Sequence, residues 1–70
     1  MTLADFVREH RKHYRMTQKT LADRAGVGLR FVRELEGGKP TLRMDKVNCI
    51  LDLFGHQLGA VPSKEAAAEQ

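Results

Sequence analysis

The chain has little of what larger or exported proteins carry. Its 70 residues include one cysteine, two prolines, one tyrosine and no tryptophan. A single cysteine cannot form an internal disulfide, which favours a reducing compartment. No apolar run approaches the roughly 18 residues of a membrane span, and the N-terminal residues lack the pattern of a secretory signal. We therefore expect one small cytoplasmic domain, too short for an enzyme with a deep pocket.

What the chain does have is positive charge on a globular composition. Twelve lysines and arginines outnumber nine aspartates and glutamates, and 41% of the residues are hydrophobic. Such a composition is typical of a folded domain rather than a disordered segment. Because chains of this length bury only a modest core, oligomerisation commonly supplements their stability. The composition predicts a small basic binding module that dimerises.

The composition changes once along the chain, near Pro62. The residues beyond it include no large apolar side chain that would anchor them to a core. We therefore expect a folded domain over residues 1–61 and a flexible tail over residues 62–70.

Capping residues and apolar spacing predict an all-helical domain. Thr2, Thr17 and Thr41 are expected N-caps, and Gly26 is the expected stop of the second helix. Helices are expected over residues 3–14, 18–25, 29–36 and 42–54. On the last of these, Cys49 is expected to be a small, mostly buried hydrophobe.

The segment 56–61 follows a different pattern. It lacks helix caps, and it is too short to form a stable strand alone. We expect it to pair with the same segment of a second copy, as a dimerising β-strand. The residues of this predicted strand are Gln57, Leu58, Ala60 and Val61.

The sequence of residues 18–36 predicts two short helices joined by a tight turn at Gly26. This is the spacing of a helix-turn-helix, which presents its second helix to the DNA major groove. The outward positions of that second helix are Leu29, Arg30, Arg33 and Glu34, and these we expect to read base edges. The arginine fork suits guanine, and an apolar tip suits a thymine methyl group. The alternatives are that the arginines only neutralise phosphates or pair with glutamates, and that Leu29 packs on Phe31.

The same stretch resembles the Xre/Cro-type helix-turn-helix family of bacterial and phage repressors, over roughly residues 3–55. The resemblance rests on Val7, Arg8, Arg11, Met16, Thr17, Gln18, Leu21, Ala22, Ala25, Gly26, Val27, Val32, Leu35, Glu36, Gly38 and Lys39. Two positions depart from the family pattern. Gly28 replaces the usual serine or threonine that opens the recognition helix, and His10 replaces a leucine in the first helix.

The resemblance implies a lambda-repressor-like fold of four to five helices that binds double-stranded operator DNA. It also implies a largely buried ion pair between Arg11 and Glu36. Exposed helix N-termini and nearby cations predict the phosphate contacts. The residues expected to make them are Gln18, Lys19, Gly28, Lys39, Thr41 and Arg43.

A narrower likeness is to the HipB-type antitoxin subgroup, carried by the Gly38–Arg43 turn and the ending Leu53–Leu58. Members of that subgroup form homodimers through the segment after the last helix, repress their own operon and bind a HipA-type kinase toxin. The likeness implies the same partners here, in a bacterial cytoplasm and on the nucleoid when DNA is bound.

Other site chemistries find no support. The three histidines and Cys49 lack zinc-site spacing, so we expect no metal and no cofactor. No catalytic triad, paired carboxylates or phosphate loop indicates an enzyme, and acidic residues dilute the basic first helix too much for a membrane surface. Two alternatives stay open: a protein-interaction module that does not bind DNA, and a lone phage-type repressor without a toxin.

Overall fold

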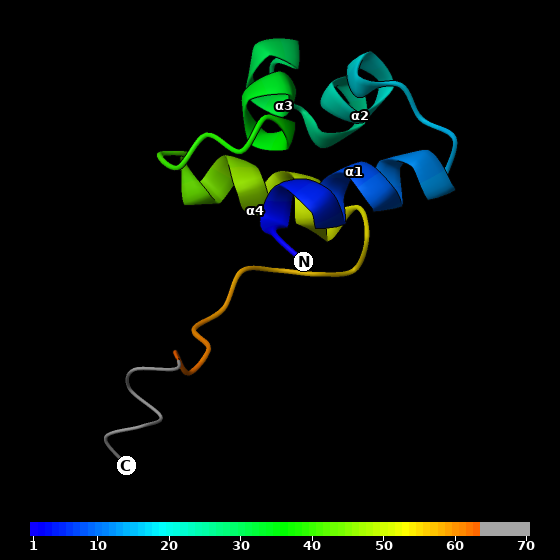
Figure 1. Ribbon diagram of the computed structural model, residues 1–70. Coiled ribbons are helices and arrows are strands. Elements are labelled where there is room, and N and C mark those ends of the chain that lie inside the picture. Colours follow the sequence, from blue (N-terminus) through cyan, green and yellow to red (C-terminus); the bar gives the residue numbers. More distant parts are fainter. Residues whose placement is uncertain (64–70) are drawn as a thin grey trace.

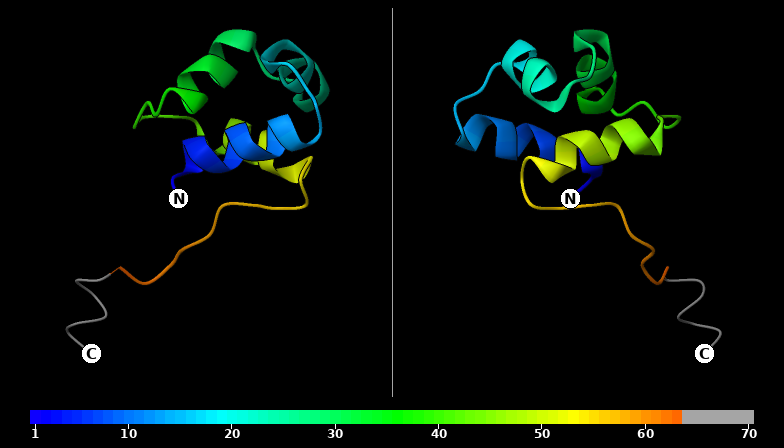
Figure 2. Two further views of the ribbon diagram at one scale, coloured as in Figure 1. Left: turned by 45° about the vertical axis from the view of Figure 1, so that its right-hand side comes forward. Right: turned by 180° about the vertical axis from the view of Figure 1, so that it is seen from behind.

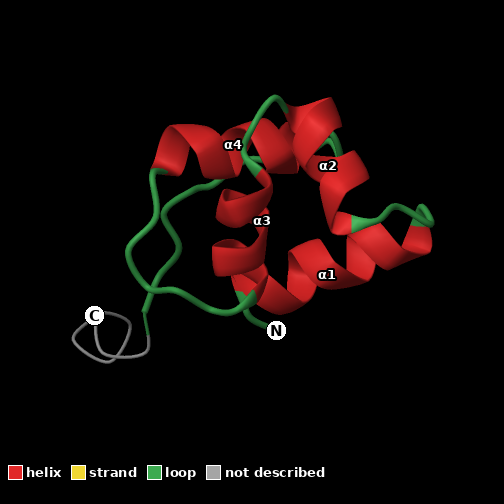
Figure 3. Cartoon of the chain, turned by 90° about the horizontal axis from the view of Figure 1, so that it is seen from above, coloured by secondary structure: helices red, strands yellow, loops and turns green. Residues whose placement is uncertain are grey.

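The computed structural model describes residues 1–63 and contains four helices. They are α1 (Leu3–His13), α2 (Gln18–Ala25), α3 (Leu29–Glu36) and α4 (Met44–Asp52). α1 and α4 form the lower layer in Figure 1, and α2 and α3 lie above it. Seen from above, α3 crosses the space between α1 and α4 (Figure 3). The expected all-helical class is confirmed for the part of the chain that the structure describes.

The first two helices begin at their expected caps. The Thr2 hydroxyl accepts a hydrogen bond from the Asp5 backbone N–H, and the Asp5 carboxylate accepts one from the Thr2 N–H in return. The Thr17 hydroxyl caps α2 by accepting from the Thr20 N–H at 3.0 Å. Each cap satisfies backbone donors that the first helical turn leaves free.

The expected start of the fourth helix at Thr41 is wrong. The N-cap is Arg43, and the helix begins at Met44. Leu42 is half-buried against the core from outside the helix. It occupies the position of a hydrophobic staple, whose usual mate is the fourth helical residue, here the buried Val47. The leucine therefore marks the approach to the helix and not its first turn.

All four helices end in one pattern of backbone hydrogen bonds. At the end of α1 the Met16 N–H donates to the Arg11 carbonyl at 3.0 Å, and the Arg15 N–H donates to Lys12. This double closure needs a residue with a left-handed backbone. Three of the four ends place glycine there, at Gly26, Gly38 and Gly55, whereas α1 uses Arg15 with φ 56°.

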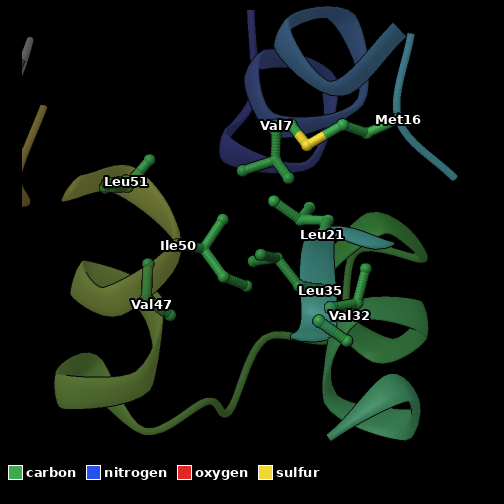
Figure 4. Close-up of a cluster of buried hydrophobic side chains, with 9 residues drawn as sticks. Val7, Met16, Leu21, Val32, Leu35, Val47, Ile50 and Leu51 are labelled. Carbon is green, nitrogen blue, oxygen red and sulfur yellow. The ribbon is translucent and has the colours of Figure 1, made fainter. Parts of the chain in front are cut away.

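The core lies where the four helices meet (Figure 4). It is built from Val7, Met16, Leu21, Ala22, Val32, Leu35, Val47, Ile50 and Leu51. Cys49 is exposed, which corrects the expectation that it is buried. The physical reason is helical spacing: Val47, Ile50 and Leu51 take the inner face, and the residue before Ile50 points about 100° away from it.

The C-terminal segment leaves the body on the side away from α2 and α3 (Figure 2). The Leu58 N–H donates to the Asn48 side-chain oxygen at 2.8 Å, and the Leu58 side chain packs against the core. Residues 56–63 contain no strand in this single chain. The dimerising strand therefore stays a prediction. The expected tail beyond Ser63 lies outside the described residues.

Candidate nucleic-acid interface

The turn between α2 and α3 holds the two helices in a helix-turn-helix arrangement. Gly26 adopts φ 72°, and the Val27 N–H closes the turn on the Ala22 carbonyl at 3.0 Å. α3 then starts after Gly28, whose own N-cap conformation is extended and brings no side-chain hydrogen bond. The buried Val32 and Leu35 fasten α3 to the core. This packing leaves the opposite face of α3 open to a ligand.

The open face of α3 carries two arginines. The Arg30 side chain is 92% exposed, and Arg33 is also exposed. Within the part of the chain that the structure describes, Arg33 forms no ion pair. Leu29 is half-buried and packs against the core, so only part of this side chain is open to solvent. Phe31 is likewise half-buried against the core and is not a free stacking surface.

Glu34 lies between two cations on the same face. Its carboxylate is 3.5 Å from the Arg30 Nε and accepts a hydrogen bond from the Lys39 ammonium. That hydrogen bond, with a smaller contribution from the Arg30 charge, lowers the pKa of the Glu34 carboxyl below its ordinary value. The carboxylate is therefore fully ionised at neutral pH and holds both cations.

The remaining candidate cations are also paired, but at the surface. Lys19 is 3.1 Å from Asp23, and Arg43 is 2.6 Å from Asp45. The hydrogen bond between Arg43 and Asp45 lowers the pKa of the carboxyl and raises that of the guanidinium. Exposed pairs of this kind contribute little free energy, so a phosphate oxygen competes readily with the carboxylate.

Two further phosphate candidates lie open to solvent. Gly28 and Thr41 are both exposed, the first at the start of α3 and the second in the loop before α4. Gly28 directly precedes α3 in the sequence, and Thr41 follows it, between Lys39 and Arg43. A backbone N–H is a donor that each residue has for a phosphate oxygen.

Below this face the Glu36 carboxylate joins three elements. It accepts from the Arg11 Nε at 2.7 Å and the Arg11 Nη2 at 3.0 Å, and from the Gln18 amide at 3.2 Å. The Arg11 and Glu36 side chains are 12% and 4% exposed. Arg11 also donates to the Met16 carbonyl at 2.9 Å. The network fixes the end of α3 against α1 and against the start of α2.

The Gln18 side chain consequently points its amide nitrogen toward the Glu36 carboxylate. Its position at the first turn of α2 is the expected one, but one of its donors is committed to Glu36. The side chain is half-buried. Its remaining donor capacity and the free N–H groups of the helix start are what it can offer to phosphate.

Sequence reasoning gave no structural role to two residues that hold this arrangement. Arg8 bridges Asp5 on its own helix and the backbone carbonyl of Glu36, at 3.2 and 2.5 Å. Asn48 holds the C-terminal segment through Leu58. A usable signal existed for Asn48, because asparagine is a poor residue for a helix interior unless its amide has a specific partner.

Apart from the Arg11–Glu36 pair, the predicted site residues divide into two groups. Those expected to touch DNA lie on α3, just before it at Gly28, at the start of α2 and between α3 and α4. Those of the predicted dimer strand follow α4 and lead away on the other side of the molecule (Figure 2). Residues 1–63 hold no group of three or more metal-ligating side chains and no helix long and apolar enough to cross a membrane.

Comparison with known proteins finds similarity to a bacterial regulator. The chain is similar to an uncharacterized HTH-type transcriptional regulator of Sinorhizobium fredii, with 49% identity over 49 residues. The match takes in 70% of this chain and 64% of the relative, so the chain spans just under two thirds of that protein. No family model matches the chain.

Proposed function

We propose that the protein is a sequence-specific, double-stranded-DNA-binding transcriptional regulator. The observation that carries this is the presentation of α3: its inner face is fixed by Val32 and Leu35, and Arg30 and Arg33 stand on its open face. The similarity to a protein named as a helix-turn-helix regulator supports the same conclusion. Neither observation requires an enzymatic activity.

In this proposal α3 enters the major groove. Arg30 and Arg33 read guanine through O6 and N7, and the open part of Leu29 contacts a thymine methyl group. Contacts to the DNA backbone fix the register of the helix in the groove. They come from Gln18, Lys19, Gly28, Lys39, Thr41 and Arg43.

We also propose that the protein acts as a homodimeric repressor in the bacterial cytoplasm. The C-terminal segment extends away from α2 and α3, so pairing of two copies through residues 56–61 leaves both α3 helices free (Figure 2). A two-fold dimer reads pseudo-palindromic half-sites about one helical turn apart or a multiple of that. Occupying such an operator blocks transcription.

The test is binding to a fluorescent duplex taken from just upstream of the gene, followed by anisotropy at about 0.15 M salt. Arg33→Ala removes a cation of α3 that forms no ion pair within residues 1–63, and Arg24→Ala removes another exposed arginine, from α2, as the matched control. A lost guanine contact costs about 1–3 kcal/mol, so Arg33→Ala should weaken binding about tenfold or more. Arg24→Ala should change it little, and a scrambled duplex should bind weakly.

Two other results would overturn the proposal. Equal binding of native and scrambled duplexes would leave only phosphate contacts and no sequence reading. Absence of binding to any duplex would favour a protein-interaction module that has kept the fold without DNA recognition.

The antitoxin role is a finer proposal, resting on the likeness of residues 38–43 and 53–58 to the HipB-type subgroup. It predicts a HipA-like kinase toxin encoded beside this gene, bound by faces away from α3. The purified kinase-like neighbour, titrated with the chain in a calorimeter, should bind and lose its kinase activity. Absence of binding, together with intact operator binding, would make the protein a lone repressor.

A further inference from the structure

The ion pairs of Glu34 are built by the way α3 ends. Arg30 lies one helical turn before Glu34, and its Nε is 3.5 Å from one carboxylate oxygen. The other oxygen accepts from the Lys39 ammonium. Lys39 is held there by its backbone, because its N–H donates to the Glu34 carbonyl at 3.0 Å and closes the helix. One carboxylate therefore forms ion pairs with two cations that the helix geometry brings to it.

These two cations have different expected partners on DNA. Arg30 lies on the face presented to base edges, and Lys39 lies in the loop presented to phosphate. The Glu34 side chain is only 28% exposed, compared with 92% for Arg30 and 47% for Lys39. DNA phosphates compete with this carboxylate for both cations. The phosphates also repel the Glu34 carboxylate, because both groups are negatively charged.

We propose that Glu34 is a specificity-determining residue of the DNA site, which withholds Arg30 and Lys39 from phosphates on a random duplex and releases them where cytosine is present. This inference rests on the proposed function. The cytosine amino group is a hydrogen-bond donor in the major groove, and glutamate accepts from it. The amino group of a cytosine at the right position thus replaces the cations that Glu34 loses. A base pair without cytosine at that position leaves the Glu34 carboxylate unpaired near phosphate.

The proposal predicts where Glu34 costs affinity and where it does not. On a scrambled duplex Glu34 should weaken binding, because it competes with phosphates for two cations and places an anion close to the DNA backbone. On the cognate duplex the penalty should largely vanish. Glu34 then raises the ratio of specific to non-specific affinity, which is the quantity that matters among many competing sites.

The test compares Glu34→Gln with wild type on cognate and scrambled duplexes over a series of salt concentrations. Glu9→Gln is the matched control, because Glu9 is an exposed glutamate on α1 and forms no ion pair within the described residues. Both variants change the net charge by the same amount. Thermal unfolding of all three proteins checks that the substitutions leave the fold intact.

Glu34→Gln should bind the scrambled duplex about fivefold more tightly than Glu9→Gln does, from the release of two weak surface pairs. Its plot of log affinity against log salt should be steeper by about 1–2, because each freed cation displaces about one counterion. The specificity ratio should fall. When single base pairs of the cognate site are varied, one position should lose its preference for cytosine in the variant only.

Failure of the inference is distinct from failure of the proposed function. If wild type binds its cognate duplex but Glu34→Gln and Glu9→Gln behave alike on the scrambled one, the withholding role is wrong. If no position changes its cytosine preference, the release by cytosine is wrong. If wild type binds no duplex, the proposed function fails and this inference fails with it.

Discussion

Among single residues, Glu36 is the one charged residue that is buried within residues 1–63. Its side chain is 4% exposed, and donors from α1 and α2 converge on its two oxygens. Burying an ion pair costs desolvation, so the pair is weak evidence for stability by itself. Its value here is geometric, because the same carboxylate sets the end of α3 relative to Arg11 and Gln18.

Removing this carboxylate should destabilise the fold strongly. Glu36→Ala leaves the Arg11 guanidinium buried without its counter-charge, a change that costs about 3–5 kcal/mol. Urea unfolding followed by circular dichroism measures the loss. Glu9→Ala, at an exposed position of α1, is the control and should shift the midpoint little. An unchanged midpoint for Glu36→Ala would contradict the network.

The titration of Glu34 tests its partnership with Lys39. Because the pKa of Glu34 is lowered mainly by the Lys39 hydrogen bond, Lys39→Gln should raise this pKa toward the ordinary glutamate value. A lowered pKa in the folded state adds stability above the unfolded-state pKa, and this stability is lost as the pH falls through the folded-state value. Carboxyl chemical shifts in NMR follow the titration directly. Identical curves for wild type and variant would contradict the pairing.

At the scale of elements, the helix ends show which structural signals the sequence carries. Thr2 and Thr17 are N-caps that the sequence predicts, and Gly26 marks the end of α2. The end of α1 carries no such mark, because Arg15 takes the left-handed position that glycine favours. Apolar spacing through Tyr14 predicts a helix over residues 3–14, and in the structure the helix ends at His13 with Tyr14 as its C-cap.

The unusual backbone of Arg15 predicts a stabilising substitution. A left-handed conformation costs a residue with a Cβ roughly 1–2 kcal/mol, and glycine avoids this cost. Glycine also gives the unfolded chain more freedom, so Arg15→Gly should raise the free energy of unfolding by about 0.5–1 kcal/mol. Arg15→Ala removes the same side chain without relieving the backbone and should give no gain. Equal stability of the two variants would contradict the backbone argument.

The turn between α2 and α3 predicts the opposite effect. A Cβ at Gly26 would meet no atom within 4 Å, so the cost of Gly26→Ala comes from φ 72° alone. The expected loss is about 1–2 kcal/mol in the free energy of unfolding, measured by thermal or urea unfolding. Gly59→Ala, where a Cβ also meets open space and φ is not left-handed, is the control and should be nearly neutral.

The sequence predicted which residues form the candidate site, but it did not predict the contacts between them. Helical spacing puts Arg30, Arg33 and Glu34 on the outward face of α3 without any coordinates. The contact between Glu34 and Lys39 depends on how the chain turns after the helix, which spacing does not give. Asparagine inside a helix indicates that Asn48 has a specific partner, but no local pattern predicts that the partner is the Leu58 N–H, ten positions away.

At the scale of the whole molecule, the candidate DNA face and the C-terminal segment lie on opposite sides (Figure 2). Leu58 is held against the core, whereas Val61 is 82% exposed. A large apolar side chain in that position gains from burial against a second copy. The layout therefore suits a dimer whose interface and DNA contacts do not compete.

Val61 provides the test of this layout. Val61→Lys places a charge where the proposed dimer buries an apolar group, so it should weaken association and, with it, binding to a two-half-site duplex. Sedimentation velocity measures the association. Met44→Lys, at another position that is 70% exposed, is the control for association and should leave it intact. Equal association of wild type and Val61→Lys would place the dimer interface elsewhere.

Selection from a random duplex library determines whether α3 reads a DNA sequence. The wild-type chain should enrich a motif of two inverted half-sites that contains G·C pairs. Arg33→Ala should enrich a motif with relaxed preference at one pair in each half-site. Enrichment of no motif by the wild-type chain, at a salt concentration where it still binds duplexes, would contradict sequence reading by α3.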